Sequence, residues 1–334
     1  MKVALVPFFS QQDKQHRKFR LDSDSGVRLY AHIADSMRQK LGWDAALYLP
    51  QEHQCVGEAP NVAIRRVPYE LCIDNLDRRL QWEPSFLRKL GEMDLVLTQH
   101  EFFPYPLRCL CPNLRIVVEC GIRPTTAYAE TAEMFKLSYE AADAVHFNSR
   151  TLADEWAFRR RWVWRFAYED SAAVPRGLPR DVDVLFNARA SATNYSNHVA
   201  FLAAFGSSEL RIAVTDPTSY LRAKTPGSVL PRLPREEYVD LLHRSKVVVS
   251  LTDNGYGGYA WIEAAAAGAV PVVLNRPEYH EVLGDDWPYY CELNTVRAVT
   301  ERALRNIPRV ARLPSCSYSG AWKVAKRNLL ELMA

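Results

Sequence analysis

Short apolar runs of strand length alternate with longer amphipathic segments along most of the chain. Uninterrupted apolar runs bounded by polar or turn residues are typical of strands that are buried on both faces. In the first half they predict strands at 3–8, 45–49, 62–67, 95–98, 115–119 and 144–148. Apolar residues at helical spacing predict a helix at 26–41, and a second helix is expected from about Thr151.

A turn-rich segment divides the chain between about Tyr168 and Val182. It contains Pro175, Gly177 and Pro179, which interrupt regular structure. After it the alternation restarts, with strands predicted at 182–187, 210–214, 247–251 and 270–274, and helices at 197–205, 235–245, 261–267 and 318–333. This order predicts an α/β protein with two Rossmann-like domains, each a parallel sheet covered by helices on both faces.

Length and composition support two soluble domains. A chain of 334 residues exceeds what one hydrophobic core usually serves, and 48% hydrophobic with 24% charged residues is an ordinary globular balance. The net charge of +3 permits local basic patches without requiring a polyanionic partner. Seven irregularly spaced cysteines predict free thiols in a reducing compartment. We found no signal peptide pattern and no apolar run of transmembrane length, so a cytoplasmic protein is expected.

The most informative motif is a glycine-rich turn followed by a helix that carries a carboxylate. The turn is Asn254-Gly255-Tyr256-Gly257-Gly258, Glu263 lies in the predicted helix, and the apolar run 268–273 follows. Glycines allow the backbone to approach a diphosphate, and a helix N-terminus offers free N–H groups to it. A carboxylate in that helix can accept hydrogen bonds from both hydroxyls of a ribose.

This pattern resembles the nucleotide-sugar site of GT-B glycosyltransferases. The resemblance implies two Rossmann-like domains facing across a cleft: an N-terminal acceptor domain at 1–170, a nucleotide-sugar domain at 171–317 and a crossover helix at 318–334. The chain end, SYSGAWKVAKRNLLELM, is also similar to the family, with Trp322 expected to serve packing. The implied donor is a UDP-sugar, and no further cofactor is implied.

Several residues take donor-site roles by the same resemblance. Glu263 would bind the ribose, and the turn from Asn254 to Gly258 and Glu281 would contact the donor. Arg189 would stabilise the diphosphate leaving group, which is the largest catalytic contribution available without a metal. Glu278 and Glu281 flank His280 in a predicted turn. Asn254 and Asn194 stand where many members have Glu and Lys, so whether the reaction retains or inverts configuration stays open.

Two residues are candidates for the catalytic base in the first half. Glu119 ends a predicted buried strand and precedes Gly121-Ile122-Arg123-Pro124, where a carboxylate is well placed to remove a proton if the reaction inverts configuration. Its position resembles that of the catalytic acidic residues in phage glucosyltransferases that modify hydroxymethylcytosine in DNA. His100, after the preceding strand, is the alternative, whereas His146 lies inside a strand and is expected to be a core residue.

Basic residues could contact an anionic acceptor. Arg17, Lys18 and Arg20 lie in the first loop, Arg123 follows Glu119, and Arg159, Arg160 and Arg161 alternate with aromatic residues between 156 and 166. Such mixing suits DNA, through phosphate contacts and base stacking, and it also suits an interfacial helix on an anionic membrane. An ordinary helix with buried aromatics and solvated arginines is the third interpretation.

These observations predict a glycosyltransferase that moves a sugar to a hydroxyl acceptor. The preferred acceptor is a hydroxymethylated base in DNA, as in phage genome modification, and the base would have to leave the duplex to react. The alternatives are a cell-envelope, lipid-linked or metabolite glycosyltransferase and a non-catalytic GT-B binding protein. Metal dependence is not indicated, because the two Asp-x-Asp strings, at 22–24 and 181–183, lie in a polar loop and at a strand start. The oligomeric state stays open.

Overall fold

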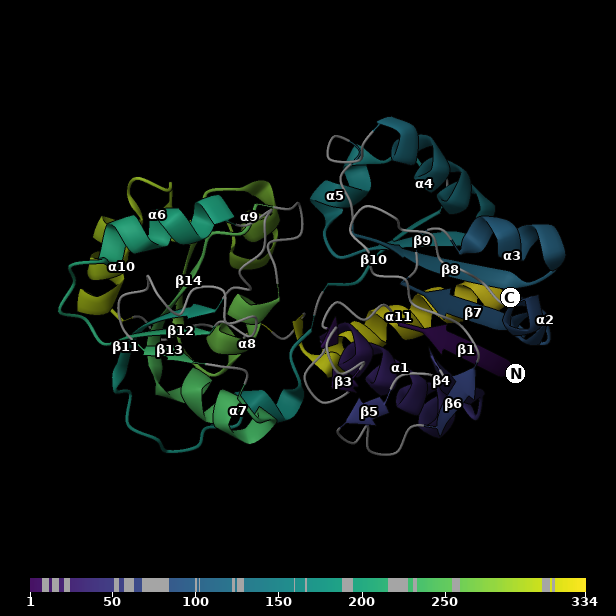
Figure 1. The fold of residues 1–334 in the computed structure, drawn as a ribbon, viewed down its shortest axis with the longest axis horizontal. Coiled ribbons are helices and arrows are strands. Elements are labelled where there is room, and N and C mark those ends of the chain that lie inside the picture. The colour runs from purple at the N-terminus through teal and green to yellow at the C-terminus, as the bar shows by residue number, and fades with distance from the viewer. Residues whose placement is uncertain are drawn as a thin grey trace. The chain divides into compact units, whose positions relative to one another are not determined.

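The computed structural model forms two compact units (Figure 1). Unit 1 comprises Met1–Asn148, Leu152–Trp164 and Trp322–Ala334, and unit 2 comprises Ser149–Thr151 and Arg165–Ala321. The structure describes residues 1–7, 12–13, 18–20, 25–50, 54–56, 63–67, 84–99, 101, 103–121, 124, 129–158, 160–165, 167–187, 195–215, 228–230, 233–253, 259–307, 313 and 316–334.

Unit 1 is built on a sheet in which every described strand pairs in parallel, in the order β10-β9-β8-β7-β1-β4-β6. The strands are β1 Lys2–Val6, β4 Asp44–Pro50, β6 Ala63–Val67, β7 Leu95–Thr98, β8 Arg115–Cys120, β9 Ala144–Phe147 and β10 Arg161–Val163. A small second sheet contains β2 Gln12–Asp13, β3 Lys18–Arg20 and β5 Gln54–Val56. The strands predicted from apolar runs are confirmed, with ends shifted by one or two residues.

The helices of unit 1 follow the strands along the chain. They are α1 Ser25–Leu41, α2 Pro84–Gly91, α3 Pro104–Leu110, α4 Ala129–Ala141 and α5 Arg150–Glu155, of which the first two residues of α5 belong to unit 2. Helix α11 (Tyr318–Met333) starts in unit 2 and continues in unit 1, where it runs beside α1 (Figure 1). The ammonium group of Lys40, near the end of α1, lies 5.7 Å from the centre of the Trp322 ring. Trp322 is buried, which confirms its predicted packing role.

Unit 2 repeats the plan with a parallel sheet in the order β13-β12-β11-β14-β15-β16. Its strands are β11 Val182–Asn187, β12 Ile212–Thr215, β13 Ser228–Leu230, β14 Ser245–Ser250, β15 Val270–Leu274 and β16 Tyr290–Cys291. Its helices are α6 Tyr195–Phe205, α7 Arg235–Arg244, α8 Ala260–Ala266, α9 Pro277–Leu283 and α10 Val296–Arg305, with a short 3₁₀ helix at Asp170–Ala173. The strand order reverses between β11 and β14, so this is the topological switch point where α/β sheets bind ligands.

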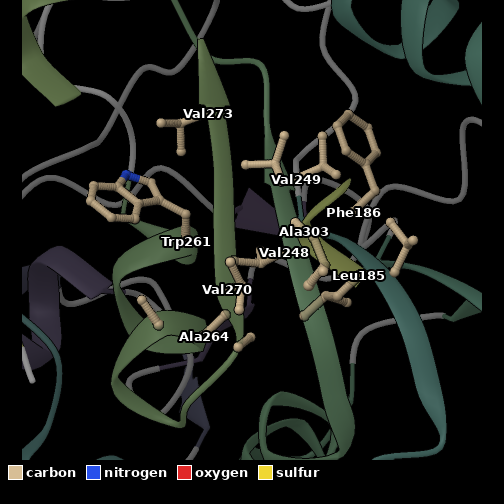
Figure 2. Close-up of a cluster of buried hydrophobic side chains, with 14 of the residues drawn as sticks. Leu185, Phe186, Val248, Val249, Trp261, Ala264, Val270, Val273 and Ala303 are labelled. Atoms are coloured by element: carbon tan, nitrogen blue, oxygen red, sulfur yellow. The ribbon is translucent and has the colours of Figure 1, made fainter. Parts of the chain in front are cut away.

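Burial on both faces explains the apolar runs of unit 2. Helices α6 and α10 lie on one side of the sheet and α7 and α8 on the other (Figure 1). Side chains of β11, β14, β15 and α8 share one hydrophobic cluster (Figure 2). Within it the ring of Phe186 stacks on Phe201 with centroids 4.1 Å apart, and Val248 in the central strand is fully buried.

Two local predictions are wrong. Residues 277–283 form helix α9 instead of a turn, because Pro277 occupies the first helical position, where its missing N–H and fixed φ favour a helix. The described residues between 156 and 165 form no helix: α5 ends at Glu155, and Arg161–Val163 is the edge strand β10 beside β9. Trp162 is aromatic and Val163 is β-branched, and both residue types are more common in strands than in helices.

The central strand of unit 2 supports a test of core packing. Val248→Thr keeps the side-chain shape but buries a hydroxyl, so we expect unit 2 to lose about 1–3 kcal/mol of unfolding free energy in urea titrations. The matched change Val199→Thr, at a position on α6 that is 45% exposed, should stay within about 0.5 kcal/mol of the parent protein. Equal losses in the two variants would contradict the assigned core.

Candidate functional site

Glu263 lies in the first turn of α8, the helix that follows β14 at the switch point of unit 2. Its side chain is buried, and its Oε1 atom lies 2.9 Å from Nη2 of Arg235 and 3.3 Å from the Tyr259 hydroxyl, which donates to it. Burial of a carboxylate is costly unless it is paired and hydrogen-bonded. The Arg235 guanidinium and the Tyr259 hydroxyl therefore stabilise Glu263 as an anion at this edge of the sheet.

A polar network continues from Glu263 to the ends of the neighbouring strands. Burial raises the pKa of Tyr238 on α7, and the negative charge of Glu263 raises it further. The Tyr238 hydroxyl accepts a hydrogen bond of 2.6 Å from Nδ2 of Asn187, and Oδ1 of Asn187 accepts one of 2.7 Å from Thr215. Asn187 and Thr215 end β11 and β12. Side chains from two strands and two helices thus meet at the carboxyl edge of this sheet.

Glu119 occupies the corresponding edge of the sheet in unit 1. It is buried in β8, where Oε2 accepts a hydrogen bond of 2.7 Å from Nε2 of Gln99 and Oε1 accepts one of 3.0 Å from Nδ2 of Asn148. Gln99 directly follows β7 and Asn148 directly follows β9. Parallel register therefore brings the three side chains together. Both donors are neutral amides, which orient the carboxylate without neutralising its charge.

His146 lies beside Glu119 in β9 without acting as its cation. Burial lowers the pKa of His146 to about 3, although the hydrogen bond with the Trp164 carbonyl raises it. The imidazole is therefore neutral near pH 7, and its Nε2 donates to that carbonyl at 2.9 Å. Its Nδ1 atom then carries no proton and, at 3.8 Å, makes no hydrogen bond to Glu119. The prediction of a core histidine is confirmed.

Several predicted donor and base residues lie outside the described residues. These are the turn from Asn254 to Gly258, Arg189, His100, Arg17, Arg123 and Arg159. Lys18 and Arg20 lie in β3, which is described only by its backbone. Their predicted roles remain predictions.

Solved structures with the same arrangement of sheets and helices match this chain, although known sequences do not. No family model and no curated protein sequence matches the chain. Among solved structures, an alpha-glucosyltransferase bound to UDP and a 13-mer DNA matches with a TM-score of 0.61 at 10% identity, covering 100% of both chains. Anabaena HepE bound to UDP-glucose gives 0.67 at 11% identity, covering 100% of this chain and 98% of its own. Sucrose-phosphate synthase from Thermosynechococcus elongatus gives 0.71 at 11% identity, covering 99% and 97%.

The fold is GT-B. This confirms the resemblance seen in the sequence and the predicted α/β class with two parallel sheets. In this GT-B chain the sequence missed Gln99, Asn148, Asn187 and Arg235 as members of polar clusters. A signal existed for three of them, because each ends or directly follows a strand, where parallel sheets gather their polar groups.

The structure gives Glu281 a contact within unit 2 that the sequence did not predict. Its carboxylate accepts hydrogen bonds from the backbone N–H groups of Arg150 and Thr151 and from the Thr151 hydroxyl, and it lies 2.9 Å from Nη2 of Arg165. Arg150 and Thr151 open helix α5, so Glu281 caps the orphan N–H groups of that helix. Glu278, also in α9, is buried and is no solvated loop carboxylate.

The basic and aromatic segment of unit 1 uses its aromatic rings for packing. Trp156, Trp162 and Trp164 are buried, so base stacking is not available to them. The guanidinium of Arg161 donates to the Ala153 carbonyl at 2.8 Å, and Arg160 is exposed. Of the three interpretations of this segment, buried aromatics with exposed arginines fits best, in a strand instead of a helix.

Within the part of the chain that the structure describes, no group of three or more His, Cys, Asp or Glu side chains could hold a metal ion. None of its helices has the length and apolar character required to cross a bilayer. The cysteines that the structure describes, Cys109, Cys111, Cys120, Cys291 and Cys316, are free thiols.

The cap formed by Glu281 predicts a pH-dependent contribution to stability. Burial alone raises the pKa of Glu281, but hydrogen bonds from Thr151 and the Arg150 N–H, with the Arg165 charge, hold it below its usual value of 4.5. A group whose pKa falls on folding stabilises the native state above its unfolded pKa and loses that contribution as pH falls through the native pKa. At neutral pH, Glu281→Gln should therefore cost about 1–3 kcal/mol in urea unfolding.

The difference between Glu281→Gln and the parent protein should shrink as the pH is lowered below about 5. Glu237→Gln, at an exposed position on α7, is the matched control and should change stability little at any pH in this range. A pH-independent cost of Glu281→Gln would contradict a role for its charge.

Proposed function

We propose that the chain is a glycosyltransferase that moves a sugar from a UDP-sugar to a hydroxyl acceptor. The observation that carries the proposal is the buried Glu263 carboxylate in the first turn of α8, at the switch point of a GT-B sheet. That is where an anion able to accept two ribose hydroxyls is useful. Structural neighbours with the same fold bind UDP and UDP-glucose.

In this proposal each half of the chain supplies a different part of the chemistry. Glu263 holds the ribose, and Arg189 with the turn from Asn254 to Gly258 binds the diphosphate and stabilises its charge as it leaves. Glu119 removes the proton of the acceptor hydroxyl. Its support is its burial and the two amides that fix its orientation. A carboxylate held this way is a competent general base.

For the acceptor we propose a hydroxymethylated base in DNA. Support comes from the alpha-glucosyltransferase neighbour, which is bound to both UDP and DNA and matches over the full length. The exposed side chain of Arg160 offers positive charge for phosphate contacts. The base would have to be flipped out of the duplex before its hydroxyl could react.

The donor and acceptor are tested together by label transfer. The protein is incubated with radiolabelled UDP-, GDP- and ADP-sugars and with hydroxymethylated DNA, unmodified DNA or lipid acceptors. We expect label from a UDP-sugar in hydroxymethylated DNA only. Label in lipid alone would contradict the DNA acceptor, and nucleotide binding without any transfer would indicate a non-catalytic GT-B protein.

The base assignment predicts a selective loss of turnover. Glu119→Gln keeps the shape of the side chain but removes the proton acceptor, so kcat should fall about 10²- to 10⁴-fold with little change in the donor KM. His100→Ala is the comparison variant, because His100 is the alternative base. A large loss of kcat in His100→Ala with near-normal turnover in Glu119→Gln would assign the base to His100 instead.

A further inference from the structure

Arg235 stands at a position where a cation is unfavourable for its own helix. It is the first residue of α7, directly after Pro234 at the cap. The positive end of the helix dipole lies at the N-terminus, so a cation there is unfavourable. The acidic residues Glu236 and Glu237 follow in the same turn, as the dipole favours. The placement of Arg235 is therefore explained by its partners outside α7.

Those partners are two carboxylates of unit 2, and the guanidinium also lies near the ring of Tyr238, which belongs to α7 itself. Nη2 of Arg235 lies 2.9 Å from Oε1 of Glu263 and 3.3 Å from Oε2 of Glu169, and the guanidinium carbon lies 5.6 Å from the centre of the Tyr238 ring. The side chains are 17% exposed for Arg235 and 4% for Glu263, so little water screens this ion pair. Glu169 is more exposed, at 41%, and contributes less.

Three side chains of unit 2 contact Glu263. Arg235 and Tyr259 contact its Oε1 atom, and the Tyr238 hydroxyl is also hydrogen-bonded to its carboxylate. A carboxylate has about four lone-pair sites on its two oxygens, which suits it to accept the hydroxyls of a ribose. The ion pair with Arg235 therefore fixes the position of the acceptor group.

We propose that Arg235 is a positioning residue for ribose recognition, holding Glu263 as an oriented anion. The inference rests on the proposed donor site. Arg235 acts through Glu263, and hydrogen bonds to a charged acceptor are stronger than bonds to a neutral one. Without its cation the buried carboxylate is no longer fixed in position or charge, and the preference for a nucleotide that carries both ribose hydroxyls falls.

The experiment measures this preference directly by calorimetry. Dissociation constants are compared for UDP and 2′-deoxy-UDP, with the GDP and ADP pairs in parallel. In the parent protein, loss of a hydrogen bond to a charged group should weaken binding of the deoxy-nucleotide about 10- to 100-fold. In Arg235→Met this ratio should fall to about 3-fold or less, and Arg235→Lys, which keeps a cation, should retain more of it. The ratio of the two dissociation constants does not depend on the fraction of folded protein. A variant that is only less stable therefore keeps the ratio of the parent protein.

Two further variants separate positioning from general electrostatics. Arg176→Met is the matched control, because Arg176 pairs with Asp240 and Glu236 on the same helix and has no described contact with Glu263. Its ratio should equal that of the parent protein. Glu263→Gln should lose discrimination by itself, and adding Arg235→Met to it should lower the ratio no further, because the two residues act as one unit.

The outcomes distinguish the two proposals. If the parent protein binds none of the three ribonucleotides, the proposed donor site is wrong and the inference fails with it. If the parent protein binds and discriminates but Arg235→Met keeps the same ratio, only the inference is overturned. Tighter nucleotide binding by Arg235→Met would also overturn it, because Arg235 would then be a competitor for Glu263.

Discussion

Parallel pairing with burial on both faces is the constraint on which the rest of this structure depends. Every described strand of the two large sheets pairs in parallel, and helices cover the sheet of unit 2 on both sides (Figure 1). Strand interiors then admit apolar side chains almost exclusively, and polar groups collect where strands end. Glu119 and Asn187 lie at such ends, and Glu263 follows β14 on the next helix.

The two buried carboxylates are stabilised in different ways, and the difference matches their proposed roles. Glu119 receives hydrogen bonds from two neutral amides and lies beside a neutral histidine, so its carboxylate is held in one orientation by uncharged groups. Glu263 is paired with the guanidinium of Arg235, which suits a group that is proposed to bind hydroxyls. A base needs reactivity, whereas a binding carboxylate needs a fixed position.

Other charged residues that the sequence suggested as ligand contacts also make contacts within the fold. Glu281 caps helix α5, and Arg161 donates to the Ala153 carbonyl near the end of that helix. The tryptophans that alternate with the arginines are buried. An alternation of charged and aromatic residues is therefore compatible with an edge strand whose bulky side chains pack inward. The pattern alone does not indicate a binding surface.

The sequence by itself determined the α/β class, most strands, helices α1 and α11, and Glu263 as the carboxylate after the glycine-rich turn. Those features depend on local periodicity and spacing, which the chain carries without its tertiary contacts. The tertiary structure alone decided the partners of that carboxylate. Arg235 and Glu263 are far apart in the chain, and nothing in the spacing links them until β14 and α8 bring α7 alongside. Ion pairs of this kind depend on which strands become neighbours, and strand order is a property of the whole sheet.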